Sequence, residues 1–181
     1  MTPGVSFGAL LTALAARTPT PGGGAAAAWT AALGCAAGAM AARYTTGPKY
    51  AAVAESAANL ATVLDHSAGA ALELAERDAA AYSAVTAARK NGGDMALAEA
   101  AAAQIPADLL ALCAVQAGAL AAFLPECNPN LASDVRVGVH LLAGAGRAAW
   151  ATLLVNRPGA ELLAVADSHR AALEAAEQGL R

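Results

Sequence analysis

Charged and aromatic side chains are scarce in this chain. Of its 181 residues, 14% are charged and 4% are aromatic, and the formal net charge is −3. An average soluble domain has about 25% charged residues. Proteins that bind nucleic acids neutralise phosphates with clustered Lys and Arg, and this sequence has no such cluster. The composition therefore argues against a nucleic-acid-binding protein.

The chain also lacks the cysteine pattern of a disulfide framework or a zinc site. Cys35, Cys113 and Cys127 are odd in number and widely spaced, and none belongs to a CxxC pair or has a histidine neighbour. Such cysteines are typical of reduced thiols in the cytoplasm. We therefore expect a cytoplasmic protein without disulfides, and the sequence indicates no metal site.

Two apolar segments call for a comparison with membrane spans. Residues 18–42 begin with proline and glycine and consist mostly of alanine, whereas residues 109–125 form a short stretch that contains Gln116. A spanning helix needs about 20 mainly apolar residues. We therefore expect no membrane-embedded segment.

Alanine dominates what is present. Hydrophobic residues make up 57% of the chain, and much of that share is alanine, a strong helix former. With no strand pattern and no repeat, the sequence predicts one all-helical domain over residues 1–181, a bundle of about six or seven helices with further surface hidden in an oligomer. Proline and glycine breaks place the helices at residues 5–16, 24–45, 49–90 (one very long helix or two stacked), 94–104, 106–123, 133–156 and 160–178.

The segment Thr-Pro-Thr-Pro-Gly-Gly-Gly at residues 18–24 is the most informative motif. The prolines restrict the approach to the next helix, and Gly22, Gly23 and Gly24 allow another group to come close to the backbone. The first N–H groups of a helix are unpaired and carry the positive end of its dipole, so they suit an anion or a polar ligand. The alternatives are a plain loop-to-helix junction and a close helix crossing.

Two pairs of polar residues are candidates for a functional site. Lys49 and Tyr50 follow a Gly-Pro break and either contact a ligand or lie at an exposed helix start. Asp78 and Tyr82 lie one helical turn apart, where a carboxylate beside a phenol could bind a polar heterocycle or transfer a proton. The alternative for Asp78 is a surface ion-pair network with neighbouring charges.

Two further groups lie in the C-terminal half. Turn formation and helix capping alone would explain Asn128, Asn130, Ser133 and Asp134. Arg136 and His140 are also one turn apart, and a lone histidine on an apolar helix is more often a core or interface residue than a catalytic one.

Five segments together resemble the family of formiminotetrahydrofolate cyclodeaminases and methenyltetrahydrofolate cyclohydrolases. Residues 18–25, with 31–34 and Met40, are similar to its PTPGGGS and GALG helix. Residues 46–50 are similar to TxGKKKY, residues 78–85 to DAxAFNAV, and residues 128–134 to NPNxxSD, while Asn156 falls where NVxxN ends. The order and spacing hold over nearly the whole chain.

The resemblance implies an all-helical homodimer, a folate-like substrate and no metal or redox cofactor, and it leaves open a formiminotransferase partner. The cyclodeaminase closes a methenyl bridge and releases ammonia, and the cyclohydrolase opens that bridge with water. The resemblance also implies one shared site. In that site Asp78, Asp134 and Lys49 would act on protons or pair with charges, and the substrate would contact Gly22, Gly23, Gly24, Tyr50, Tyr82, Asn128, Asn130 and Ser133.

Three positions depart from the family pattern. Pro48 interrupts the lysine run so that Lys49 stands alone, Arg136 replaces a glycine, and Thr152 replaces the first asparagine of NVxxN. A tight pocket would have to rearrange to accept an arginine. The resemblance favours a cyclodeaminase, with a cyclohydrolase as one alternative, and the three departures support the other alternative, a non-catalytic helical dimer.

Overall fold

The computed structural model describes residues 6–180, which form six α-helices, two short 3-10 helices and no strand. The prediction of an all-helical bundle is therefore confirmed, although the predicted helix start at Val5 lies outside the described residues. The elements are α1 (Phe7–Ala15), α2 (Gly23–Arg43), η1 (Pro48–Tyr50), α3 (Ala54–Asn91), α4 (Met95–Phe123), η2 (Pro129–Leu131), α5 (Ala132–Val155) and α6 (Ala160–Gln178).

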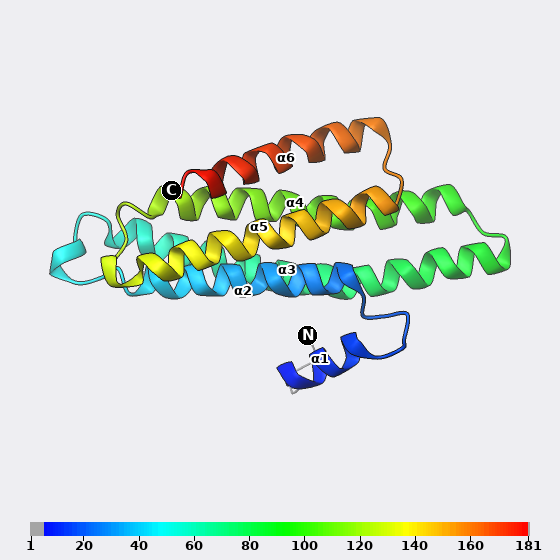
Figure 1. Ribbon diagram of the computed structural model, residues 1–181, viewed down its shortest axis with the longest axis horizontal. Coiled ribbons are helices and arrows are strands. Elements are labelled where there is room, and N and C mark those ends of the chain that lie inside the picture. Colours follow the sequence, from blue (N-terminus) through cyan, green and yellow to red (C-terminus); the bar gives the residue numbers. More distant parts are fainter. Residues whose placement is uncertain (1–5, 181) are drawn as a thin grey trace.

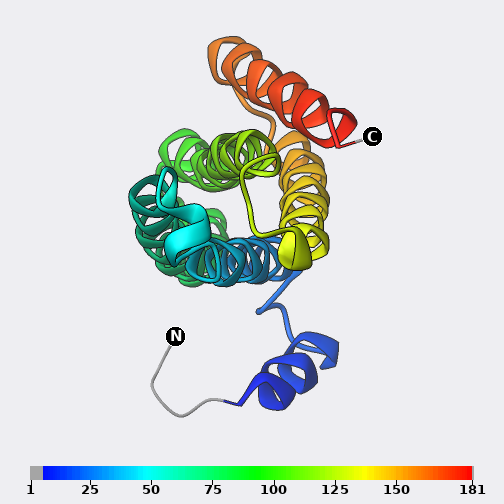
Figure 2. The same ribbon diagram turned by 90° about the vertical axis from the view of Figure 1, so that its left-hand side faces the viewer.

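Helices α2 to α5 form an up-down-up-down four-helix bundle. Each packs against its neighbour in the chain, and α5 closes the ring against α2 (Figure 2). Helix α6 lies outside this ring against α4 and α5 (Figure 1). Short connections between consecutive helices favour this antiparallel order, as the sequence predicts.

Small residues allow the helices of the ring to pack closely. A Cβ on Gly34 of α2 would lie 3.0 Å from the Gly138 carbonyl of α5, and a Cβ on Gly138 would lie 3.0 Å from the Gly34 carbonyl. Gly38 makes room for the Leu120 side chain of α4 in the same way. The core is thus built from alanine and glycine contacts around a few fully buried leucines, namely Leu64, Leu110, Leu120, Leu142 and Leu153.

The predicted break between residues 104 and 106 is wrong, because α4 runs unbroken through Pro106. Proline has no N–H, so the carbonyl of Ala102, four residues earlier, loses its normal partner in the helix. The side-chain amide of Asn156, from the end of α5, donates to that carbonyl at 3.3 Å. A residue distant in the sequence therefore compensates for the proline.

Helices α3 and α4 extend beyond the rest of the ring. With 38 residues, α3 is about 57 Å long, against about 31 Å for the 21 residues of α2. Their joining turn projects from one end of the molecule (Figure 1). No residue from 76 to 101 is buried. The projecting pair of helices is therefore held mainly by its own contacts.

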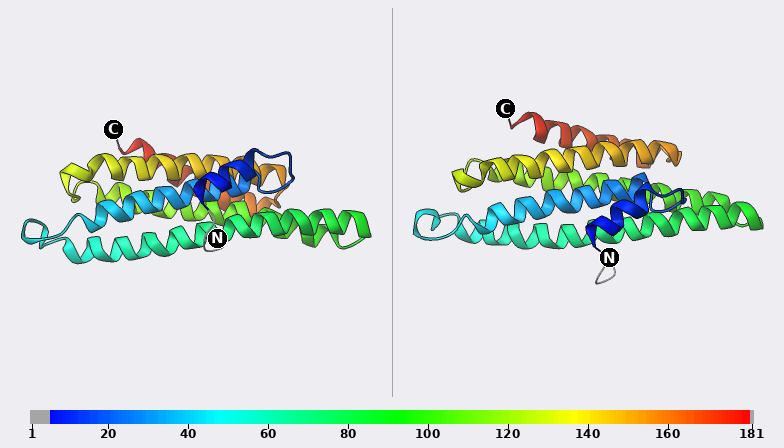
Figure 3. Two further views of the ribbon diagram at one scale, coloured as in Figure 1. Left: turned by 90° about the horizontal axis from the view of Figure 1, so that it is seen from below. Right: turned by 60° about the horizontal axis from the view of Figure 1, so that its bottom comes forward.

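Helix α1 stands apart from the bundle on the side of α2 and α5 (Figures 2 and 3). It buries none of its residues, and Phe7 and Leu11 are 56% and 49% exposed. Isolated helices this short are unstable in water. The apolar face of α1 therefore lacks a partner among residues 6–180.

Three segments are long and apolar enough to cross a membrane by length and composition alone: Gly23–Arg43, Met95–Phe123 and Pro129–Val155. About half of each apolar window is buried inside the bundle, with values of 61%, 56% and 44%. The apolar residues of these segments thus pack against one another in the ring. The expectation of no membrane-embedded segment stays a prediction.

Candidate functional site

The glycine-rich start of α2 holds a carboxylate of the same chain. Gly22 is the N-cap residue of α2 and offers no side chain to the first N–H groups. Asp78, from the middle of α3, lies against Gly24, where a Cβ would overlap its carboxylate, and it accepts a hydrogen bond from the Ala25 N–H. Asp78 therefore takes the place of the missing cap.

The environment of Asp78 changes its protonation. Burial raises the pKa of this carboxyl group above its usual value, and the hydrogen bond from the Ala25 N–H opposes that rise without cancelling it. The sequence predicts that the start of α2 suits an external anion, but this helix start already faces the Asp78 carboxyl group. That group holds its proton more tightly than usual. The contact of Gly22 to Gly24 with substrate stays a prediction.

A cavity of about 220 Å³ opens beside Asp78. Tyr82 lies one turn further along α3, lines the same cavity and is half exposed. Thr152 and Asn156 at the end of α5 and Ala102 on α4 complete the polar part of the wall. The sequence analysis named Asp78 and Tyr82 but not Ala102. The signal for Ala102 is its position four residues before Pro106, because proline has no N–H to bond its carbonyl.

A second polar cluster lies where α2 ends. The Asn128 backbone N–H donates to Thr45 Oγ1 at 3.0 Å, and its side-chain amide donates to the Tyr44 carbonyl at 3.2 Å. Asn128 Oδ1 also accepts from the Asn130 N–H at 3.1 Å. Asn128 therefore fastens the turn before α5 to α2, and the buried Thr45 is a partner that sequence reasoning missed.

The remaining candidate residues belong to the same end of the bundle. Ser133 Oγ lies 3.4 Å from Asp134 Oδ2 in the first turn of α5. Lys49 in η1 is exposed, and its Nζ lies 5.3 Å from the centre of the Tyr50 ring. No ion pair between Lys49 and a carboxylate occurs among residues 6–180.

The two clusters lie at opposite ends of α2, about 31 Å apart along its axis. The first contains Gly22, Gly24, Asp78 and Tyr82, and the second contains Lys49, Tyr50, Asn128, Asn130, Ser133 and Asp134. The prediction of one shared site is therefore not met within a single chain.

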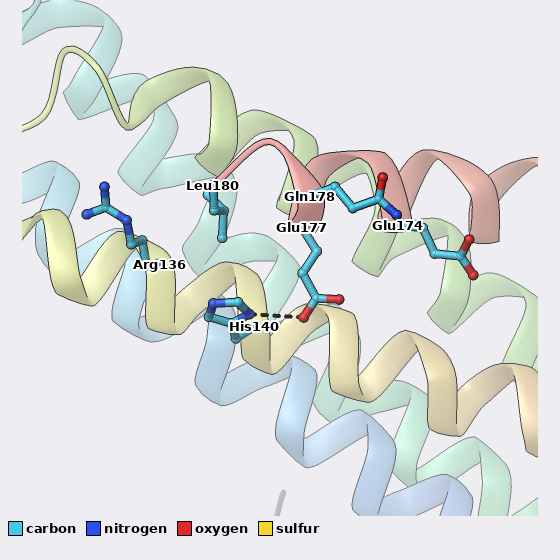
Figure 4. A pocket seen from close by; sticks show the side chains of 6 residues that line it. All are labelled: Arg136, His140, Glu174, Glu177, Gln178 and Leu180. Carbon is cyan, nitrogen blue, oxygen red and sulfur yellow. Dashed lines mark hydrogen bonds and ion pairs between the residues drawn. The ribbon is translucent and has the colours of Figure 1, made fainter.

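A different cavity, of about 430 Å³, lies between α5 and the end of α6 (Figure 4). His140 Nδ1 lies 2.9 Å from Glu177 Oε1, and Arg147 donates to Glu177 Oε2 at 2.6 Å. The hydrogen bond from Arg147, followed by the hydrogen bond with His140, lowers the pKa of Glu177. Arg136 lines this cavity, so its departure from the family pattern lies outside the cavity beside Asp78.

Cys35 and Cys113 belong to neither cluster, whereas the Cys127 thiol donates to the Asn128 carbonyl at 3.5 Å. All three are buried, and burial raises the pKa of Cys35 to about 12 and raises that of Cys113 as well. Thiols with such pKa values are poor nucleophiles. Within residues 6–180, no three His, Cys, Asp or Glu side chains gather as metal ligands would.

An up-and-down bundle with a polar cavity between its helices belongs to a class of helical proteins that build small-molecule sites from facing helices. A family model described as Formiminotransferase-cyclodeaminase matches residues 6–175. Because this match spans most of the chain, the chain belongs to that family, as its motifs predict.

A solved structure agrees with this assignment. The formiminotetrahydrofolate cyclodeaminase from Thermotoga maritima is 25% identical in sequence, with a TM-score of 0.92 over 97% of this chain and 93% of that one. No curated protein matches the chain.

Proposed function

We propose that the chain is a formiminotetrahydrofolate cyclodeaminase, which converts 5-formiminotetrahydrofolate to 5,10-methenyltetrahydrofolate and ammonia. The family and the structural relative support the reaction. The observation that carries the proposal is the position of Asp78, half-buried at the start of the glycine-rich helix and beside an open cavity.

The reaction needs a proton at the leaving nitrogen. N10 of the folate attacks the formimino carbon on N5 and gives up its proton to the former imino nitrogen. A second proton lets that nitrogen leave as ammonia, and the methenyl bridge remains. A carboxyl group with a raised pKa retains its proton closer to neutral pH, which suits a general acid for this step.

We also propose a homodimer in which each site draws on both copies. The face of α2 that points out of the ring carries Leu33, Met40 and Tyr44, which are 48%, 37% and 61% exposed. An antiparallel pair of α2 helices would cover this face. It would also bring the start of α2 in one copy to the end of α2 in the other, and thus unite the clusters of Asp78 and Asp134.

Absorbance of the methenyl-folate product tests the proposed reaction. Purified protein should form this product from 5-formiminotetrahydrofolate, and the D78N variant should lose at least about tenfold in kcat. The D167N variant, altered at an exposed carboxylate of α6 that pairs with Arg170, is the matched control and should retain full activity.

Two other results of this assay have a defined meaning. Loss of added methenyl-folate without reaction of the formimino substrate would identify a cyclohydrolase instead. No change with either substrate would support a non-catalytic helical dimer. The cytoplasmic location and the formiminotransferase partner stay predictions.

A further inference from the structure

The cavity between α5 and the end of α6 carries opposite charges at its two ends. Its volume of about 430 Å³ lies in the range of about 300 to 1,000 Å³ that is common for small-molecule pockets. Arg136 of α5 lies at one end and Glu174 of α6 at the other, with His140 and Glu177 between them (Figure 4). Leu180 contributes an apolar side chain to the same wall.

The guanidinium group of Arg136 has donors to spare. Its Nη1 donates to the Ala132 carbonyl of its own helix at 3.4 Å, and no ion pair of Arg136 occurs among residues 6–180. By contrast, Arg147 and Arg170 of the same two helices both pair with carboxylates. A guanidinium group has five N–H donors in a planar fork that matches the oxygens of a carboxylate. Arg136 can therefore bind the carboxylate of a ligand.

The two carboxylates of the cavity differ in what they have left to offer. Glu177 uses both oxygens, one with His140 at 2.9 Å and the other with Arg147 at 2.6 Å. Glu174 uses only Oε1, which accepts from Arg170 at 2.6 Å. No hydrogen bond to Glu174 Oε2 occurs among residues 6–180. This oxygen can therefore accept from a cationic donor.

These charges select the class of ligand. A simple anion would be attracted to Arg136 but would also face Glu174 and Glu177, and a simple cation would meet the reverse arrangement. A molecule with a carboxylate at one end and an ammonium group at the other avoids both repulsions. The cavity therefore matches a dipolar ligand.

The spacing of the two charged ends sets the length of that ligand. Helices α5 and α6 are antiparallel, and His140 lies opposite Glu177 (Figures 1 and 4). Arg136 lies one turn before His140, and Glu174 lies about one turn before Glu177, so about 10 Å along the helix axes separates the two ends. Charge-assisted hydrogen bonds of about 2.8 Å at each end leave about 5 Å between the charged groups of the ligand. A short carbon chain spans this distance.

We propose that this cavity binds a small linear aminocarboxylate, with its carboxylate on Arg136 and its ammonium group on Glu174. The site is separate from the proposed reaction, because none of its lining residues belongs to the cluster of Asp78 or to that of Asp134. The family pattern has a glycine where this chain has Arg136, so the site is a feature of this chain.

Three probes of similar size test the need for two charges. We would titrate the full-length protein with 4-aminobutyrate, with butyrate, which lacks the amine, and with butylamine, which lacks the carboxylate, and measure each affinity by calorimetry. 4-Aminobutyrate should bind at least about fivefold more tightly than either of the others. Equal binding of butyrate would identify a simple anion site and overturn the proposal, as would no binding of 4-aminobutyrate.

Substitutions at the two ends assign each contact. R136Q should weaken 4-aminobutyrate and butyrate about fivefold and leave butylamine unchanged. E174Q should weaken 4-aminobutyrate and butylamine and leave butyrate unchanged. Both side chains are exposed, so the variants should keep the circular dichroism and melting temperature of the wild type.

Two matched controls complete this experiment. R89Q near the end of α3 and E161Q at the start of α6 alter exposed charges outside the cavity, and they should bind all three probes as the wild type does. If R136Q or E174Q left 4-aminobutyrate binding unchanged, or if a control weakened it equally, the assignment would be wrong. No folate is present in these titrations, so their result does not depend on the cyclodeaminase reaction.

Discussion

At the scale of single residues, Asp78 combines two tasks in one carboxyl group. It caps the first turn of α2, and it faces the cavity proposed for the substrate. Both tasks depend on Gly24, because any side chain there would occupy the space of the carboxylate. At Gly24, the absence of a Cβ makes room for the Asp78 carboxylate, and this matters more than the conformational freedom of glycine.

Substitution of Gly24 and of a helical glycine outside the cavity tests this dependence. The G24A variant should displace Asp78, lower kcat by about a hundredfold and cost about 1 to 3 kcal/mol in the free energy of unfolding. G69A in α3 is the matched control, because Gly69 does not line the cavity and a Cβ there meets no atom within 4 Å. Steady-state kinetics and urea unfolding measure both effects, and equal behaviour of the two variants would contradict the role of Gly24.

At the scale of elements, one cluster of charges joins α6 to α5. Glu177 on α6 meets His140 and Arg147 on α5, and Leu173 of α6 fills the space above Gly146 of α5. The apolar contact buries surface, whereas the ion pairs are partly exposed and contribute little each.

The E177Q variant should therefore be destabilised by less than about 1 kcal/mol at pH 7. The pKa of Glu177 is lowered in the folded state, so its contribution is present above the pKa of the unfolded chain and is lost as the pH falls through the folded pKa. Wild type and variant should converge in urea unfolding once the pH falls below the lowered pKa of Glu177 in the folded state. A difference that persists in acid would assign the effect to packing.

Breaks between helices could be predicted where the backbone alone decides. The Asn-Gly-Gly-Asp turn ends α3 with Gly92 in the left-handed region at a φ of 71°, and Asp94 caps α4 as expected. Pro106 could not be judged in this way, because its missing hydrogen bond is compensated by Asn156, far along the chain. Local rules fail where the compensating residue lies in another element.

The candidate site could be predicted in its parts but not in its assembly. Gly24, Asp78 and Tyr82 meet because α2 and α3 are neighbours in the ring. The turn with Asn128 precedes α5, and in an up-down-up-down order α5 starts at the end of the bundle where α2 finishes. The spacing of the motifs along the chain does not indicate which end of the bundle each motif occupies.

At the scale of the whole molecule, α1 lies on the same side of the bundle as α2 (Figure 3), and both helices expose large apolar residues. Exposed apolar helix faces of this kind are typical of interfaces with another chain. The proposed antiparallel dimer covers α2 and places each α1 beside the second copy.

Complementation between two inactive variants tests whether the copies share a site. D78N and D134N should each be inactive alone, and chains unfolded together and refolded should regain about a quarter of wild-type activity, since half the dimers are mixed and each has one intact site. Sedimentation of the refolded mixture should show a dimer. No regain of activity in a dimeric mixture would show that each site belongs to one chain.

The projecting ends of α3 and α4 have a consequence for how a ligand enters. No residue from 76 to 101 is buried, so few contacts oppose the local opening of this pair of helices. Asp78 and Tyr82 stand at its root, where the cavity begins. The amides of residues 80–100 should therefore exchange their hydrogens with solvent sooner than those of α5, and a bound ligand should slow that exchange first at the root. The proposed substrate site therefore borders the part of the bundle that we expect to open most readily.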